Sequence, residues 1–186
     1  MKNYFKFIIL VFQFLIMGSS FGQTLKGKDI IISCLVPDNI LGRYNLGIEY
    51  FLPSQDSVSF LSSIMINGGK TNATLLGKRI EGVDFTAEIN VYGEVLLKRK
   101  WNEYVGLKLS GGRFKNVTTM ENKNFFFIGI GTGIQPIIAK RIAVRLSSDV
   151  GYMRNGLSET LLFNDGSDPF NSGFTVIFNL GIGIKF

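Results

Sequence analysis

Seven charged residues fall on the polar faces of segments in which apolar and polar residues alternate. They are Glu49, Asp84, Glu88, Lys108, Arg145, Asp149 and Lys185. These four acids and three bases are nearly balanced, and charges held away from bulk water must pair or be neutralised. We therefore expect an interior network of ion pairs that fills the space between the segments. A polar lumen that conducts ions or small solutes is the alternative use of the same residues.

Catalytic and metal chemistry have few candidates in this sequence. The absence of histidine excludes Ser-His and Cys-His catalysis and the common zinc sites, and a single cysteine excludes an internal disulfide. Asp84 and Glu88 are about 13 Å apart along one strand face, too far for paired glycosidase carboxylates. Asn164–Asp168 is rich in oxygen ligands, but its spacing does not match an EF-hand and suits an ordinary turn. We predict no enzyme activity, no cofactor and no metal site.

The composition indicates a protein of the membrane or cell envelope. The chain has 186 residues, which suits one domain, and 18% of them are charged, below the roughly 25% of soluble domains. The hydrophobic fraction is 46% and the mean hydropathy is +0.24. The net charge of +6 comes from basic residues spread along the chain, so nucleic acid is not an expected partner.

Residues 1–22 have the layout of a cleaved secretory signal. Lys2 and Lys6 give a positive start, Phe7–Met17 is an almost unbroken apolar run of 11 residues, and small residues follow. This run is too short to cross about 30 Å of hydrocarbon, so a membrane anchor is disfavoured. We predict a signal peptide over 1–22 and one mature domain over 23–186.

Beyond the signal, apolar and polar residues alternate with a period of two. From Phe174 to Phe186, apolar residues fall on one face, and small or polar residues such as Asn179 and Gly181 fall on the other. Successive side chains of a β-strand point to opposite faces, and about ten residues suffice for a tilted membrane strand. Eight segments have this pattern or a similar apolar stretch: 28–36, 44–52, 57–67, 83–95, 103–111, 126–136, 141–153 and 174–186. We predict an all-β fold, an eight-stranded antiparallel up-and-down transmembrane β-barrel.

The connections between these segments alternate in length. Three short ones are Pro53–Asp56, Lys98–Asn102 and Ile138–Lys140, and three long ones are Gly68–Ile80, Gly112–Asn124 and Arg154–Ser172. Outer-membrane barrels have short periplasmic turns and longer extracellular loops. The alternation predicts a barrel in the outer membrane of a Gram-negative cell, with both termini in the periplasm and the long connections facing outward.

A soluble eight-stranded barrel is the principal alternative. Its polar face would point to water and be dense in Lys and Glu, whereas this polar face is largely Gly, Ser, Thr and Asn. Small residues suit the crowded interior of an eight-stranded barrel. Aromatic residues gather near strand ends, as in the interface girdles of membrane barrels: Tyr44, Tyr50, Phe60, Trp101, Tyr104, Phe126, Tyr152 and Phe174. The pattern favours the membrane barrel.

The C-terminal residues resemble the β-signal of outer-membrane proteins, a final Phe preceded by apolar residues at alternate positions. The matching residues are Phe178, Leu180, Ile182, Ile184 and Phe186. This resemblance implies that the barrel-assembly machinery reads the segment during insertion. The mature chain resembles the small eight-stranded barrels of the OmpA/OmpX/OmpW type, in particular the Bacteroidota outer-membrane β-barrel family. Asp56-Ser57-Val58 also matches the short O-glycosylation motif of Bacteroidota envelope proteins.

Six basic residues fall in or beside the first two long connections, on the side predicted to face outward. They are Lys70, Lys78, Arg79, Arg113, Lys115 and Lys123, against two acids, Glu81 and Glu121. Lipopolysaccharide phosphates would supply the counter-charge through charge-assisted contacts. Solvated loops without a ligand are the alternative interpretation. We predict outer-membrane lipid and lipopolysaccharide as partners.

Three functions fit these observations. The first is a non-enzymatic structural or accessory barrel, as a subunit of a larger complex with other outer-membrane proteins. Its small size and a filled interior favour this function. The second is a narrow channel for small solutes, favoured by the glycines of 126–136 and 173–186. The third is surface recognition through the long connection 154–172. We rank the first above the others.

Overall fold

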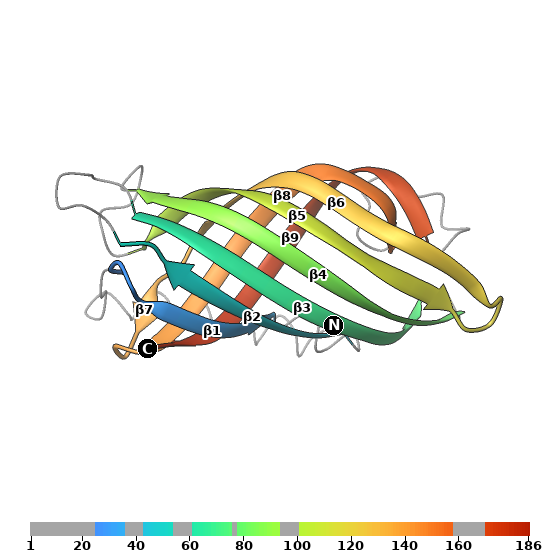
Figure 1. Cartoon of the computed structure of the whole chain (residues 1–186), viewed down its shortest axis with the longest axis horizontal. Coiled ribbons are helices and arrows are strands. Elements are labelled where there is room, and N and C mark those ends of the chain that lie inside the picture. The colour runs from blue at the N-terminus through green and yellow to red at the C-terminus, as the bar shows by residue number, and fades with distance from the viewer. Residues whose placement is uncertain (1–24, 36–42, 54–60, 76–77, 94–100, 158–169) are drawn as a thin grey trace, which may run out of the picture.

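The computed structural model describes residues 25–35, 43–53, 61–75, 78–93, 101–157 and 170–186. These ranges hold nine β-strands: β1 (Ile30–Leu35), β2 (Arg43–Phe51), β3 (Leu61–Leu75), β4 (Lys78–Gly93), β5 (Glu103–Asn116), β6 (Glu121–Ile134), β7 (Ile137–Ile138), β8 (Ile142–Leu157) and β9 (Phe170–Lys185). All belong to one antiparallel sheet (Figure 1). In the described ranges, no helix is long and apolar enough to span a membrane. The predicted signal peptide, Asp56-Ser57-Val58 and Asn164–Asp168 lie outside the described residues.

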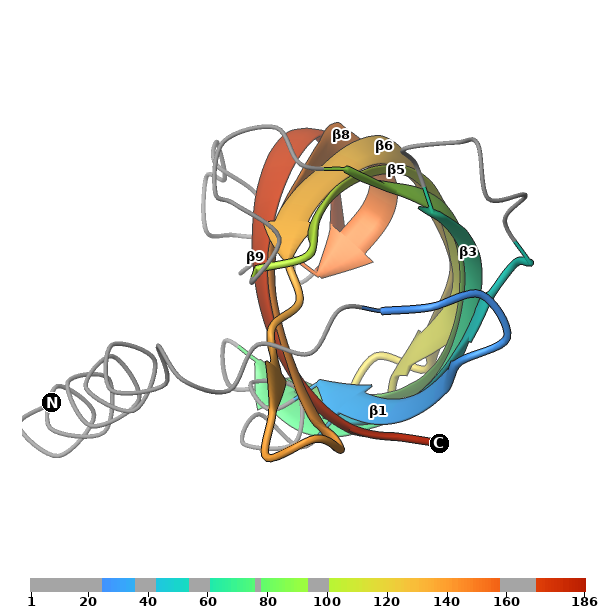
Figure 2. The same ribbon diagram turned by 90° about the vertical axis from the view of Figure 1, so that its left-hand side faces the viewer.

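The sheet closes into a barrel. β1 to β6 pair in sequence order, each with its neighbour. β6 then pairs with β8, β8 pairs with β9, and β9 pairs with β1. Beside this last seam, Ile30 and Phe186 exchange two backbone hydrogen bonds, of 3.3 and 2.8 Å. Figure 2 shows the cylinder end-on, with the C-terminus next to β1. The predicted eight-stranded antiparallel up-and-down barrel is confirmed, because eight strands form the ring and the two-residue β7 pairs only with β8 among the described strands.

The predicted long connections are wrong, because many of their residues form strands. β3 and β4 pair up to Leu75 and Lys78, so most of Gly68–Ile80 is hairpin strand. β5 and β6 pair up to Asn116 and Glu121, and a turn over 117–120 is all that joins them. β8 and β9 extend into the third connection as far as Leu157 and Phe170.

Glycines in these stretches mark close contact between strands rather than turns. A Cβ built on Gly69 would lie 2.7 Å from Asp84 Oδ1, and one built on Gly112 would lie 2.8 Å from Asp84 Cα. A glycine within a strand often marks such a close approach of a neighbour. Since no proline interrupts the pairing of β3 to β6, the hairpins extend past the segments predicted from alternation.

The segment after β6 also departs from the predicted strand 126–136. β6 ends at Ile134, two residues before Pro136, which has no backbone N–H to continue the pairing. The backbone N–H of Gln135 donates instead to Trp101 O at 2.9 Å. The chain then enters β7, where Ile137 is buried. This turn therefore brings Gln135 and Ile137 into the interior.

The two faces of the wall differ in exposure. Apolar side chains at alternate positions of the ring strands point outward and are exposed, among them Leu107, Ile130 and Phe178. Five of the predicted girdle aromatics also point outward: Tyr44, Tyr50, Phe126, Tyr152 and Phe174. Tyr104 does not belong to a girdle, because its strand position places it on the inner face, where it is buried. The outer face is therefore apolar along the barrel wall.

Two apolar clusters lie at opposite ends of the interior. The cluster next to the chain termini contains Leu25, Ile31, Phe51, Tyr92, Tyr104, Ile137 and Ala143. Its aromatic rings pack in sequence, with centroids 5.2 Å apart for Phe51 and Tyr92 and 5.1 Å for Tyr92 and Tyr104. At the opposite end, which holds the β3–β4 and β5–β6 hairpins and is called the hairpin end below, Ile80 and Phe114 pack with Phe125. The buried charged side chains of Glu49, Glu88, Arg145 and Asp149 lie between these two clusters.

Candidate functional site

Arg145 on β8 is the centre of the polar interior, and only 6% of it is exposed. Its Nη2 donates to Glu88 Oε2 at 2.5 Å, and its Nε donates to the Tyr104 hydroxyl at 2.7 Å. Its Nη1 lies 3.6 Å from Glu49 Oε2. These partners come from β2, β4 and β5, so one guanidinium connects opposite parts of the wall.

Lys108 extends the network along the neighbouring strands. It lies directly opposite Glu88 in the β4–β5 register, and its Nζ is 3.4 Å from Glu88 Oε1. The same ammonium lies 2.6 Å from Asp149 Oδ2, which also accepts a hydrogen bond of 2.7 Å from Asn179 Nδ2. Glu88 therefore bridges the two cations, and Asp149 ends the chain of ion pairs.

Glu49 depends mainly on neutral donors. Its carboxylate accepts hydrogen bonds from Ser63 Oγ at 2.5 Å, Tyr92 OH at 2.8 Å and Gln135 Nε2 at 2.9 Å, and a longer one from Asn90 Nδ2 at 3.3 Å. The network holds three carboxylates and two cations, so the third carboxylate cannot be balanced by charge alone. Hydrogen bonds from buried neutral groups replace the water that this carboxylate loses.

The structure brings together five of the seven residues singled out for the interior. Asp84 lies four residues from Glu88 on the inner face of β4, nearer the β3–β4 hairpin, beside Gly69 and Gly112. Lys185 lies at the terminal end, where its Nζ is 3.3 Å from Asp29 Oδ2. These two residues share the inward direction of the others but occupy other levels along the barrel axis.

Inner-face glycines accommodate large side chains of adjacent strands. A Cβ on Gly131 would lie 2.6 Å from Asp149 Oδ1, and one on Gly133 would lie 2.8 Å from the Tyr104 hydroxyl. The glycines of 126–136 had favoured an open channel in the sequence. In the structure they make room for the network instead, so they carry no argument for a channel.

The basic residues assigned to loops lie on strands. Lys70 is on β3, Lys78 and Arg79 are on β4, Arg113 and Lys115 are on β5, and Lys123 is on β6. Two of them pair with the acids beside them: Arg79 with Glu81 at 2.8 Å, and Lys123 with Glu121 at 2.5 Å. The prediction that these basic residues lie in loops is wrong, because Gly68 and Gly112, which were expected to begin the loops, lie within β3 and β5.

The residues of the C-terminal motif occupy the outer face of β9. Phe178 is 77% exposed, Ile182, Ile184 and Phe186 are also exposed, and Leu180 is half-buried. The apolar half of the alternation therefore faces away from the lumen over the whole motif.

Several network residues were not identified from the sequence as site residues: Ser63, Asn90, Tyr92, Gln135 and Asn179. Each lies at an inward position of its alternating segment, so strand parity was the available signal. Parity marks these positions as inward, but it does not distinguish the neutral donors that the carboxylates require from other small polar residues.

The arrangement suits structural support of the barrel wall. In the ranges that the structure describes, no group of three or more His, Cys, Asp or Glu side chains is placed to hold a metal ion. The charged side chains that meet in the network are engaged with one another and with neutral donors. Their common effect is to fill the lumen and to connect strands across it.

Comparisons with known proteins address the fold. No protein-family model matches the sequence, and no curated protein matches it. Among solved structures, the chain is similar to the N-terminal β-barrel domain of OprF from Pseudomonas aeruginosa, with a TM-score of 0.56 and 12% identity over 87% of this chain and 100% of that one. The chain has the fold of that barrel. The finer assignment to the Bacteroidota family stays a prediction.

Removing Arg145 tests whether the network stabilises the barrel. We expect Arg145→Ala to lower the free energy of unfolding by about 3–5 kcal/mol, because it leaves buried carboxylates without their cation. The matched control Arg79→Ala removes an exposed pair and should cost about 0–1 kcal/mol. Urea titration of the folded barrel in detergent micelles measures both. Equal effects of the two substitutions would contradict a network centred on Arg145.

Proposed function

We propose that the protein is an integral outer-membrane β-barrel with a non-enzymatic, structural or accessory role. The observation that carries this proposal is the combination of an apolar outer wall with a lumen occupied by its own side chains. Exposed apolar residues along the ring strands match a hydrocarbon environment, because soluble proteins rarely expose large contiguous apolar areas. The barrel fold shared with the OprF domain supports the same environment.

The filled lumen favours a structural role over a channel. Ion pairs around Arg145 occupy the middle, and apolar clusters lie toward both ends. A water path would have to pass the Phe51, Tyr92 and Tyr104 rings at the terminal end. Opening it would break buried hydrogen bonds and ion pairs, each costly when only one partner is removed.

The orientation is part of the proposal. We place both termini in the periplasm and the β3–β4 and β5–β6 hairpins on the outer side of the membrane. Exposed Lys70 and Arg113, together with Lys78 and Lys115, then lie where lipopolysaccharide phosphates are available. The exposed motif from Phe178 to Phe186 would be read by the barrel-assembly machinery during insertion.

A charge on the outer face tests the membrane location. Ile130→Arg, near the middle of β6, should destabilise the barrel in lipid vesicles by about 2–4 kcal/mol, because the charge would face hydrocarbon. Met120→Arg is the matched control, since Met120 is exposed in the turn beyond the strands and its replacement should cost about 0–1 kcal/mol. Urea unfolding in vesicles measures the difference. Equal costs, or a protein soluble without detergent, would contradict the proposal.

The accessory role predicts a stable partner in the membrane. A tagged full-length protein, extracted in mild detergent under native conditions, should co-purify with another outer-membrane protein in a fixed ratio. The control is the same extraction of an unrelated tagged barrel from the same cells. A protein that migrates alone after mild extraction would contradict an accessory role and leave a free-standing barrel.

A further inference from the structure

The apolar band on the outer face of the barrel ends at two basic residues near the hairpin end. On β5, the outward positions between Glu103 and Arg113 hold no charge; they are Val105, Leu107, Leu109 and Gly111. The stretch from Glu103 to Arg113 is about 33 Å long, which is about 25 Å tall at a strand tilt of about 40°. This height matches the apolar band of a membrane barrel, so Arg113 lies at the level of the lipid phosphates.

Lys70 on β3 lies at the same level as Arg113, two strands away. Val83 on β4 is the cross-strand partner of both residues, so their Cα atoms are about 10 Å apart. Both basic side chains are exposed, and neither forms an ion pair within the part of the chain that the structure describes. Glu81, one level nearer the hairpin turn, is held by Arg79 at 2.8 Å. Two long cationic side chains at this spacing can therefore converge on one anion.

β1 and β2 separate in the part of the wall next to Lys70. Their pairing reaches Ser33 and Gly47, and the next residue of β1, Cys34, pairs with Ile182 on β9. From Gly47 toward its start, β2 has only β3 as a partner among the described strands. The sheet is therefore interrupted between the end of β1 and the start of β2.

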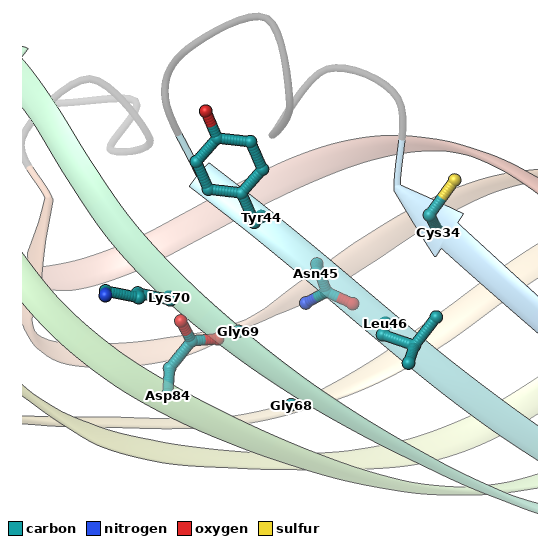
Figure 3. A pocket seen from close by; sticks show the side chains of 8 residues that line it. All are labelled: Cys34, Tyr44, Asn45, Leu46, Gly68, Gly69, Lys70 and Asp84. Carbon is teal, nitrogen blue, oxygen red and sulfur yellow. The ribbon is translucent and has the colours of Figure 1, made fainter.

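A hollow of about 510 Å³ lies at this interruption. Most of its lining residues belong to the outer face of the wall: Cys34, Tyr44, Leu46, Gly68 and Lys70. In Figure 3, Cys34 lies at the end of β1, and Tyr44 and Leu46 lie across from it on β2. Gly68 leaves space in the wall, because a Cβ built there would have no atom within 4 Å. A largely apolar hollow with a free ammonium group among its lining residues suits a ligand that is both acylated and anionic.

We propose that this site binds one lipopolysaccharide molecule, with a phosphate between Lys70 and Arg113 and an acyl chain in the hollow beside Lys70. The inference rests on the orientation proposed above, which places the hairpin end in the outer leaflet. Charge-assisted hydrogen bonds from lysine and arginine select a phosphate. A phospholipid fits less well, because Lys115 follows one level further outward, where phosphorylated sugars of lipopolysaccharide lie and a phospholipid has no second phosphate.

Native mass spectrometry of the full-length protein, refolded in a nonionic detergent, tests the site. The probes are the phosphorylated lipid portion of lipopolysaccharide, the same lipid after enzymatic removal of its phosphates, and phosphatidylglycerol. We expect saturable binding of one phosphorylated lipid per barrel, and at least tenfold weaker binding of each of the other two probes. Absence of saturable binding, or equal binding of the dephosphorylated lipid, would overturn the proposal. Equal binding of phosphatidylglycerol would overturn lipopolysaccharide as the occupant.

Two double variants separate the basic pair from a general effect of charge. Lys70→Gln combined with Arg113→Gln should weaken binding of the phosphorylated lipid at least tenfold, because the phosphate loses both charge-assisted contacts. The matched control is Lys140→Gln combined with Arg141→Gln. It removes the same charge from two exposed residues of the turn before β8, at the terminal end, and should leave binding unchanged. Equal losses in the two double variants would contradict the proposal.

A second pair of variants tests the hollow. Gly68→Ile fills it from a position where the new side chain meets no neighbour at its Cβ, and should weaken lipid binding at least threefold. Ala87→Ile enlarges an outward residue of β4 that does not line the hollow, and should leave binding unchanged. Heat-modifiable gel mobility verifies that each variant folds, and a folded Gly68→Ile that binds like the wild type would contradict the placement of the acyl chain. The vesicle experiment with Ile130→Arg tests the membrane location separately, so a barrel that passes it but binds no lipopolysaccharide contradicts this inference alone.

Discussion

A guanidinium buried in the middle of a narrow barrel constrains the residues around it. Arg145 loses its hydration on folding, at a cost of several kcal/mol, and must recover that energy from partners with good geometry. Glu88, Glu49 and Tyr104 provide it, from strands that lie far from Arg145 in the sequence. The network can form only when the sheet has closed. In return, it joins strands that share no backbone hydrogen bonds, which favours one register of the barrel.

The narrow lumen determines how the remaining inward positions are used. Large inward residues such as Asp149 and Tyr104 require glycines on the neighbouring strands, and Gly131 and Gly133 meet this need. The network residues are buried between apolar clusters, and the lower local dielectric that goes with burial strengthens each charge–charge contact. Apolar packing and polar network therefore support one another, and the outer face is left free to be apolar.

The alternation of apolar and polar residues was sufficient to predict the barrel, because strand parity assigns each side chain to a face without tertiary information. It also predicted the inward direction of Arg145 and Glu88. It could not predict the pairing among charges, since that depends on strand register. The long connections were predicted wrongly because Gly68 and Gly112 can end a strand or accommodate a neighbour, and only the partner strand decides between these uses. The neutral donors to Glu49, such as Ser63 and Gln135, lie at inward positions that the alternation indicates, but their meeting at one carboxylate again depends on the register.

The central claim is that the interior network closes the lumen to ions, and conductance across a planar lipid bilayer tests it most directly. The refolded wild-type barrel, inserted at a density confirmed independently, should carry no steady current in either voltage direction. We expect this because the pairs around Arg145 and the aromatic cluster at the terminal end occupy the space that a water path would need. A steady current from the wild type, altered in size or ion selectivity by Arg145→Ala, would contradict the account.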